Sequence, residues 1–224
     1  ISCDICIVGA GFTGLSAGLH LAEAGYKVVI LEAEKVGWGA SGRNAGQMVN
    51  GFNKDYGQLK RYGEDTARAI IEMSFEGSDI IRERVAKYNI DCDLKTGGTF
   101  FAAFTQKQMD ELAQEKQTWE RFGNNNLRLM SKSEMPEIVG SDLYCGGLLD
   151  GRGGHMHPLN LALGQAAAIE ALGGKIYEGS RVTDIVRADK PSVVTEQGKV
   201  TADYIILAGN AYFGKMIREL SVRT

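Results

Sequence analysis

The chain has 224 residues, of which 44% are hydrophobic and 24% charged, a composition ordinary for a globular protein of one large or two small domains. Its net charge of −3 provides no global positive field that would attract nucleic acid or an acidic membrane surface. No apolar run approaches the roughly 18 residues that span a bilayer, and no basic segment followed by an apolar one predicts a secretory signal.

The first thirty residues predict the unit of a parallel α/β sheet. Residues 5–8 and 27–31 are short apolar runs typical of buried strands, and residues 12–24 between them predict a helix that Gly25 would cap. Residues 33–62 are rich in glycine and polar side chains, which indicates a loop with one short helix at most.

Residues 64–88 predict a long amphipathic helix. Its apolar stripe comprises Ala67, Ile70, Ile71, Ile80, Ile81 and Val85. A strand is expected over 99–104, and Thr105 with Gln108 forms a capping box that would begin a helix running to residue 122, where Gly123 ends it.

The second half predicts short strands around one further helix. Weaker strand patterns cover 127–130 and 145–149. Pro158 suits the first turn of a helix over 159–172, which Gly173 and Gly174 would stop. Four strands are then expected over 175–177, 181–186, 192–195 and 203–207, and a helix over 211–220.

Cysteine and histidine do not predict a metal site. Cys3 and Cys6 have the spacing of a redox or metal pair, but they lie at the start of an apolar strand with no second pair to complete a site. Reduced thiols and a cytoplasmic location are therefore expected. His155 and His157 have no carboxylate or cysteine at ligand spacing, so we expect them in a turn before the helix that Pro158 begins.

The segment from Gly9 to Gly14 has the pattern G-x-G-x-x-G between a strand and a helix, the context that a nucleotide-binding fingerprint requires. Gly9 would allow the tight turn, Gly11 would let the backbone approach a pyrophosphate, and Gly14 would permit close packing of helix on strand. The free N–H groups and the positive dipole of the helix would then face the phosphates.

Glu32 ends the second predicted strand, where a carboxylate accepts hydrogen bonds from ribose hydroxyls and repels a 2′-phosphate. FAD or NAD is therefore favoured over NADP. Residues 39–47, GASGRNAGQ, favour FAD, because a polar glycine loop suits a cofactor that extends beyond its pyrophosphate. Ser41 would reach a phosphate, while Arg43, Asn44 and Gln47 would hydrogen-bond the polar edge of a flavin.

These stretches resemble the glycine oxidase, sarcosine oxidase and D-amino-acid oxidase superfamily of FAD-dependent oxidoreductases, and within it the bacterial gamma-glutamylputrescine oxidoreductases. The resemblance extends over nearly the whole chain. It is carried by residues 9–32, 37–47, 75–77, 80–84, 90–93, 153–161 and 208–212.

The resemblance implies an α/β, Rossmann-like FAD-binding domain of the GR2 type, formed by residues 1–90 and 150–224, with residues 91–149 as part of an α+β substrate domain. Family members are much longer, so the chain would be their N-terminal portion without the C-terminal remainder. By the resemblance, the backbone of Val182 would hold the adenine, and Ala208 and Gly209 would pass beside the cofactor. The predicted cofactor-binding residues are Gly9, Gly11, Phe12, Thr13, Gly14, Glu32, Ala33, Ala40, Ser41, Arg43, Asn44, Gln47, Val182, Ala208 and Gly209.

The implied reaction oxidises the C–N bond of a primary amine, gamma-glutamylputrescine, to an aldehyde, with dioxygen as electron acceptor and release of ammonia and hydrogen peroxide, in putrescine catabolism. No nucleophile–base pair identifies catalytic residues, because a flavin carries the redox chemistry. Three alternatives stay open: oxidation of a D-amino acid, glycine or sarcosine; a non-catalytic FAD-binding subunit; and an NAD-dependent dehydrogenase. The oligomeric state is left open.

Overall fold

The computed structural model describes residues 1–51 and 60–216, which divide into two compact units. The first unit comprises residues 1–44, 87–92 and those from 157 onward; the second comprises 45–86 and 93–156. Residues 45–86 and 150–156 therefore lie outside the unit that holds the nucleotide-binding turn, unlike the boundaries expected from the sequence. In this part of the chain β3 (Gln47–Met48) pairs with β7 (Gly154–His155) of the second unit rather than with a strand of the parallel sheet.

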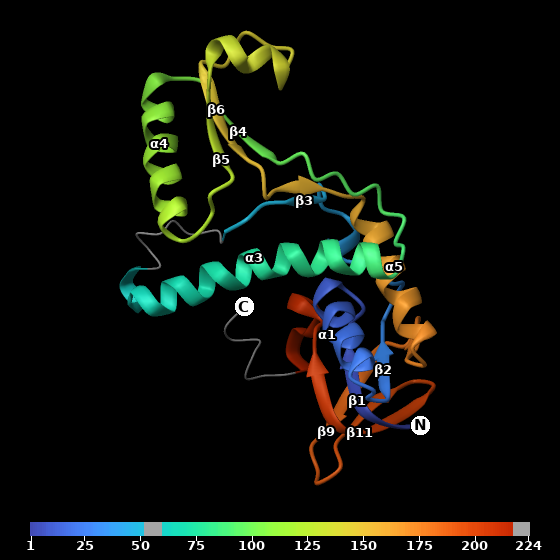
Figure 1. Cartoon of the computed structure of the whole chain (residues 1–224). Coiled ribbons are helices and arrows are strands. Elements are labelled where there is room, and N and C mark those ends of the chain that lie inside the picture. Colours follow the sequence, from blue (N-terminus) through green and yellow to red (C-terminus); the bar gives the residue numbers. More distant parts are fainter. Residues whose placement is uncertain (52–59, 217–224) are drawn as a thin grey trace. The chain divides into compact units, whose positions relative to one another are not determined.

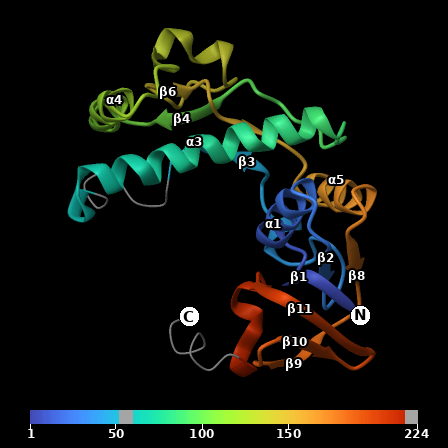
Figure 2. The ribbon, with the colours of Figure 1, turned by 60° about the horizontal axis from the view of Figure 1, so that its bottom comes forward.

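The first unit is a six-stranded sheet with helices against it (Figures 1 and 2). Its strand order is β8-β2-β1-β11-β10-β9. The strands β8, β2, β1 and β11 pair in parallel, and β10 pairs antiparallel with both of its neighbours, β11 and β9. The elements are β1 (Ser2–Val8), α1 (Phe12–Glu23), β2 (Val28–Leu31), η1 (Ala40–Gly42), α5 (Pro158–Ala171), β8 (Lys175–Tyr177), β9 (Val182–Val186), β10 (Ser192–Thr195), β11 (Gly198–Leu207) and η4 (Asn210–Met216).

Two apolar clusters form the core of this unit, one on each face of the central strands. Alternation along β1 directs Ile7 toward α1 and α5, where Leu19 and Ile169 are fully buried, and directs Cys6 toward β9, β10 and β11. Cys3 and Cys6 are free thiols on this second side, and burial raises the pKa of the Cys6 thiol to about 12. Both cysteines therefore act as small apolar core residues.

The strand β11 is longer than the sequence predicted. Only 203–207 was expected, but the strand begins at Gly198: residues 198–201 pair with β10, and residues 201–207 pair with β1. The expected helix over 211–220 is also different, because the described part is a 3₁₀ turn (η4) interrupted at Gly214, whose φ is +51°. The rest of that prediction, from residue 217, lies outside the described residues.

The second unit contains a three-stranded antiparallel sheet in the order β4-β6-β5, with α4 packed on it, and a two-stranded ribbon of β3 and β7. The side chain of Thr105 and that of Gln108 form the predicted capping box of α4. The elements are β3 (Gln47–Met48), η2 (Lys60–Tyr62), α3 (Glu64–Lys87), β4 (Thr99–Ala103), α4 (Gln106–Arg121), β5 (Leu127–Ser131), η3 (Lys132–Glu137), β6 (Gly146–Asp150) and β7 (Gly154–His155).

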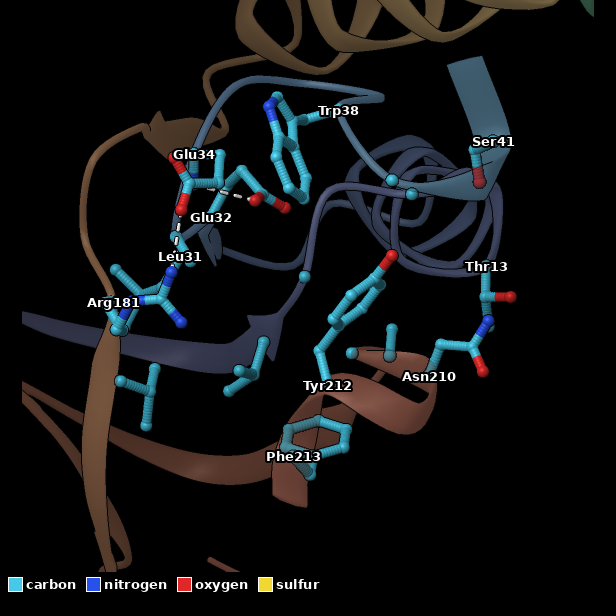
Figure 3. A pocket seen from close by; sticks show the side chains of 18 of the residues that line it. Thr13, Leu31, Glu32, Glu34, Trp38, Ser41, Arg181, Asn210, Tyr212 and Phe213 are labelled. Carbon is cyan, nitrogen blue, oxygen red and sulfur yellow. Dashed lines mark hydrogen bonds and ion pairs between the residues drawn. The ribbon is translucent and has the colours of Figure 1, made fainter. Parts of the chain in front are cut away.

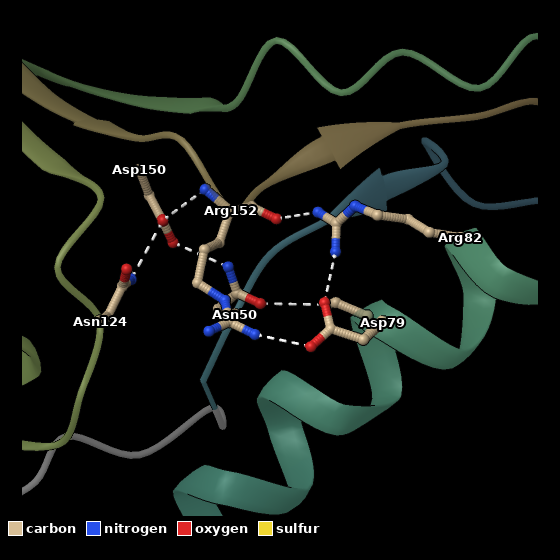
Figure 4. A network of polar contacts seen from close by, with 7 residues as sticks. Asn50, Asp79, Arg82, Asn124, Asp150 and Arg152 are labelled. Carbon is tan, nitrogen blue, oxygen red and sulfur yellow. Dashed lines mark hydrogen bonds and ion pairs between the residues drawn. The ribbon is translucent and has the colours of Figure 1, made fainter.

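A buried carboxylate organises the polar interior of this unit (Figure 4). Asp150 is 5% exposed and accepts hydrogen bonds from the side chains of Asn50 (2.9 Å) and Asn124 (3.1 Å) and from the backbone N–H of Arg152 (3.0 Å). Three donors satisfy the carboxylate without a cation on it, since the Arg152 guanidinium pairs instead with Asp79 at 2.8 Å. The network joins β6 to α3 and to the segment before β5.

Candidate nucleotide-binding site

The turn between β1 and α1 is held by the ends of the strands beside it. The N–H of Gly9 donates to the carbonyl of Leu31 at 2.8 Å, and Gly9 has a φ of +106°. A Cβ on Gly9 would lie 2.7 Å from the carbonyl oxygen of Ala208, so both conformation and space require glycine here. The predicted tight turn is confirmed.

Gly14 and Gly11 serve the turn in different ways. A Cβ on Gly14 would lie 2.0 Å from the carbonyl oxygen of Gly9, so α1 approaches the turn as closely as predicted. A Cβ on Gly11 would instead meet the Oγ of Ser41 at 3.0 Å. The first obstacle to a side chain at Gly11 is therefore a hydroxyl of the protein, which the sequence did not predict.

Ser41 connects the glycine-rich loop to the start of α1. It lies in the 3₁₀ turn η1, and its Oγ accepts a hydrogen bond of 2.9 Å from the N–H of Phe12, the first residue of the helix. Gly11, the residue at the N-cap position, has no side chain to do this. The N–H groups of Thr13 and Gly14, in the same first turn, have no acceptor within the helix and provide donors for an anion.

Glu32 follows β2 and is held in place by backbone N–H groups. Its Oε2 accepts from Ala10 at 2.8 Å and its Oε1 from Glu34 at 2.9 Å. Each carboxylate oxygen has a second lone pair, so Glu32 can still accept from a ligand hydroxyl. The carboxylate is thus preorganised beside the nucleotide-binding turn.

The loop after β2 is tied to the loop between β8 and β9. Backbone bonds run from Ser180 N–H to the carbonyl of Glu32 (2.8 Å) and from Gly179 N–H to that of Glu34 (3.0 Å). Lys35 pairs with Glu178 at 2.8 Å. The hydrogen bonds from the Lys35 ammonium and then from the Val36 amide hold the pKa of Glu178 below its usual value.

A cavity of about 280 Å³ lies over the turn, between these loops and the end of β11 (Figure 3). It is close to the lower end of the range of roughly 300–1,000 Å³ that small-molecule sites occupy. Eleven of the predicted residues line it: Gly9, Gly11, Phe12, Thr13, Glu32, Ala33, Ala40, Ser41, Val182, Ala208 and Gly209.

Four predicted residues are not among those that line this cavity. Gly14 contacts the turn, as described above. Arg43 folds back on its own loop: its Nε donates to the carbonyl of Trp38 at 2.6 Å and its guanidinium lies 4.7 Å from the centre of the Trp38 ring. Asn44 donates to the carbonyls of Ala40 and Ser41. Gln47 belongs to the second unit, in β3, where it pairs with His155.

Several lining residues were not predicted from the sequence, above all Glu34, Trp38, Arg181, Asn210 and Tyr212. Trp38 and Tyr212 meet edge to face with ring centres 6.4 Å apart, and both are exposed. Two of these residues could have been found from their position in the sequence, because each is close to a predicted site residue. Glu34 lies two positions after Glu32, and Arg181 directly precedes Val182. No pattern in the sequence identified the aromatic pair.

Neither a metal centre nor a membrane span emerges from the described parts of the chain. Within residues 1–51 and 60–216, no three His, Cys, Asp or Glu side chains gather closely enough to hold a metal ion. Over the same residues, none of the helices is both long and apolar enough to cross a bilayer. His157 caps α5, because its Nδ1 accepts a hydrogen bond from the N–H of Asn160 at 3.2 Å.

Comparison with known proteins agrees with this geometry. The family model described as FAD dependent oxidoreductase (DAO) matches residues 4–224. The chain belongs to this family. FAD is accordingly the family's cofactor, and the α/β FAD-binding fold with a parallel sheet, predicted from the sequence, is confirmed.

Two curated relatives match along most of the chain. It is 52% identical to the gamma-glutamylputrescine oxidoreductase of Escherichia coli K12, over 100% of this chain and 53% of that protein. It is 46% identical to the probable oxidoreductase OrdL of Haemophilus influenzae, over 93% of this chain and 49% of that protein. The chain thus spans about half the length of the curated relatives it matches.

Solved structures share the fold. Glycine oxidase from Geobacillus kaustophilus superposes with a TM-score of 0.77 at 24% identity, covering 98% of this chain and 58% of that one. The L-amino acid deaminase from Proteus vulgaris gives a TM-score of 0.80 at 21% identity, covering 98% and 50%. At these identities the likeness concerns architecture alone.

Proposed function

We propose that this chain is the FAD-binding part of an enzyme that oxidises the C–N bond of a primary amine, gamma-glutamylputrescine, in putrescine catabolism. The observation that carries the proposal is the cavity over the β1–α1 turn, in which a fixed carboxylate and free helix N–H groups face the same space in a member of an FAD-dependent family. The 52% identity to a gamma-glutamylputrescine oxidoreductase supports the choice of substrate.

The residues at the cavity fit the ADP part of FAD. The first turn of α1 offers N–H groups and a positive dipole to a pyrophosphate. Glu32, already oriented by two backbone bonds, would accept from ribose hydroxyls. Val182 lines the cavity at the start of β9, where its backbone would meet the adenine, and Gly209 would pass beside the cofactor.

Bound FAD would supply the redox chemistry by accepting a hydride equivalent from the carbon beside the amine nitrogen. The whole reaction then balances as amine, water and dioxygen giving aldehyde, ammonia and hydrogen peroxide. The residues of this chain hold and orient the cofactor. Arg43, Asn44 and Gln47 as contacts of the flavin ring stay predictions, with the first two already hydrogen-bonded within their own loop.

The choice among amines rests on degree of similarity. Identity to the monomeric sarcosine oxidase of Bacillus sp. is 21% and to the glycine oxidase of Bacillus licheniformis 22%, against 52% for the gamma-glutamylputrescine oxidoreductase. The larger identity favours gamma-glutamylputrescine over glycine or sarcosine.

The test uses the full-length protein. An absorbance spectrum of the purified protein should show bound flavin, and anaerobic gamma-glutamylputrescine should bleach it, whereas glycine and sarcosine should not. In air, one hydrogen peroxide should form for each aldehyde. Absence of flavin would overturn the proposal. Bleaching by sarcosine alone would identify sarcosine, and not gamma-glutamylputrescine, as the substrate. Flavin that no amine bleaches would indicate a non-catalytic subunit. Reduction without peroxide would exclude dioxygen as the acceptor.

A further inference from the structure

A charged pair lies in the wall of the cavity. The Nη2 of Arg181 and the Oε1 of Glu34 are 2.7 Å apart, and both residues line the cavity (Figure 3). Glu34 belongs to the loop after β2, and Arg181 directly precedes β9. The side chain of Arg181 is 65% exposed and that of Glu34 41%, so neither is held by burial.

This pair is not what joins the two loops. Backbone hydrogen bonds from Gly179 and Ser180 already do so, and Lys35 with Glu178 forms a second pair between the same loops. Unlike Glu34 and Arg181, neither Lys35 nor Glu178 is among the residues that line the cavity. Exposed ion pairs contribute little to stability, and ordering an arginine side chain costs entropy. A role in ligand binding explains the pair better than a role in folding.

The backbone next to Arg181 determines where its side chain begins. The next residue, Val182, is 6% exposed and pairs with Thr195 in the sheet, so the guanidinium emerges beside the strand end expected to meet the adenine. A guanidinium is planar and stacks on aromatic rings, which a lysine ammonium does not do. The carboxylate of Glu34 neutralises the arginine and restricts the plane of its guanidinium.

We propose that Arg181 contacts the adenine ring of the bound dinucleotide and that Glu34 is a positioning residue for that contact. The proposal rests on the proposed function, because it takes FAD as the ligand. The pair of Arg181 with Glu34 has no net charge, so it adds no net positive charge to this wall of the cavity for the 2′-phosphate of a phosphorylated dinucleotide.

The experiment measures binding to the full-length protein after removal of its flavin. FAD affinity is read from the change in flavin fluorescence, and ADP affinity from isothermal titration. Arg181→Ala should raise the Kd of both ligands about tenfold, because both carry adenine. Arg181→Lys should lose nearly as much, and Glu34→Gln should raise both constants about threefold. Lys35→Met, which breaks the matched pair outside the cavity, should change neither.

The results distinguish three explanations: a direct contact of Arg181 with adenine, an effect of its charge alone, and an effect on the structure of the two loops. Wild-type affinity in Arg181→Lys would show that a point charge suffices, and wild-type affinity in Arg181→Ala would show no contact; either overturns the proposal. An equal loss in Lys35→Met would assign the effect to the loops and overturn it as well. If the unaltered protein binds ADP through Arg181 but no FAD, the proposed function fails and the adenine contact stands; if it binds neither, both fail.

Discussion

The contact between Gly11 and Ser41 allows a quantitative prediction about the nucleotide-binding turn. Gly11 has a φ of −82°, which alanine adopts without strain, so Gly11→Ala tests space alone. The added Cβ would lie 3.0 Å from the Oγ of Ser41, closer than ordinary contact. The hydroxyl must shift by a few tenths of an ångström, which weakens its 2.9 Å bond from the N–H of Phe12.

The magnitude follows from that bond. Loss of a side-chain acceptor at a helix N-terminus costs about 1 kcal/mol, and a tight contact adds about 1 kcal/mol. Gly11→Ala should therefore lower the free energy of unfolding by about 1–2 kcal/mol. Ser41→Ala removes the acceptor and should cost about 1 kcal/mol. In the double variant the clash is gone, so it should be about as stable as Ser41→Ala by itself.

The assay is urea unfolding of the flavin-free full-length protein and its three variants, followed by FAD titration. Strong coupling between the two substitutions is the expected result, because they share one contact. If the costs simply add, the Cβ of residue 11 does not meet Ser41. If stability is unchanged but Gly11→Ala abolishes FAD binding in both backgrounds, the side chain enters the pyrophosphate path instead, and our reasoning about this turn is refuted.

Three further predictions concern carboxylates. Glu32→Ala should raise the Kd for FAD about tenfold to a hundredfold, since it removes an oriented acceptor, and unchanged flavin content on purification would contradict this. Asp150→Ala should lower the free energy of unfolding by about 3 kcal/mol, because three buried donors lose their acceptor; a urea midpoint equal to that of the unaltered protein would refute it. Hydrogen bonds from Lys87 and then Tyr88 lower the pKa of Glu23 to about 2, so its contribution to stability is present above pH 5 and is lost as the pH falls toward 2. The stability difference from Glu23→Gln should shrink by about 1 kcal/mol over that interval, a figure reduced for solvent screening, and a constant difference would show that Glu23 is unpaired.

The sequence predicted those parts of the fold that local signals determine. The helix of the strand–helix–strand unit, its second strand, the capping box of Thr105 with Gln108 and the helix that begins at Pro158 appear within a residue of the expected bounds, whereas the first strand begins at Ser2, three residues before its expected start. What it missed depends on pairing between distant segments. The first half of β11 looks polar in isolation and is a strand because β10 pairs with it. The two residues of β7 form a strand because β3 lies opposite.

For the site, too, the residues within one local unit were predicted and the pairing between distant segments was not. The glycine pattern and Glu32 lie within one local unit, so their placement could be deduced from spacing. Arg43 as a ligand contact stays a prediction, and the sequence did not indicate that its side chain would contact the Trp38 carbonyl and ring of its own loop. The pairing of Glu34 with Arg181 joins residues 147 positions apart, and neither has a local pattern that indicates its partner.

The length of β11 has a consequence for how this protein tolerates change. The strand continues directly into Ala208, whose carbonyl leaves no room for a side chain on Gly9. Adding one residue between 201 and 207 would advance the following backbone by about 3.3 Å and turn every later side chain to the opposite face. Insertions should therefore be better tolerated in the exposed turn between β9 and β10, at residues 187–190, whereas between residue 201 and the cavity the residue count itself is under constraint.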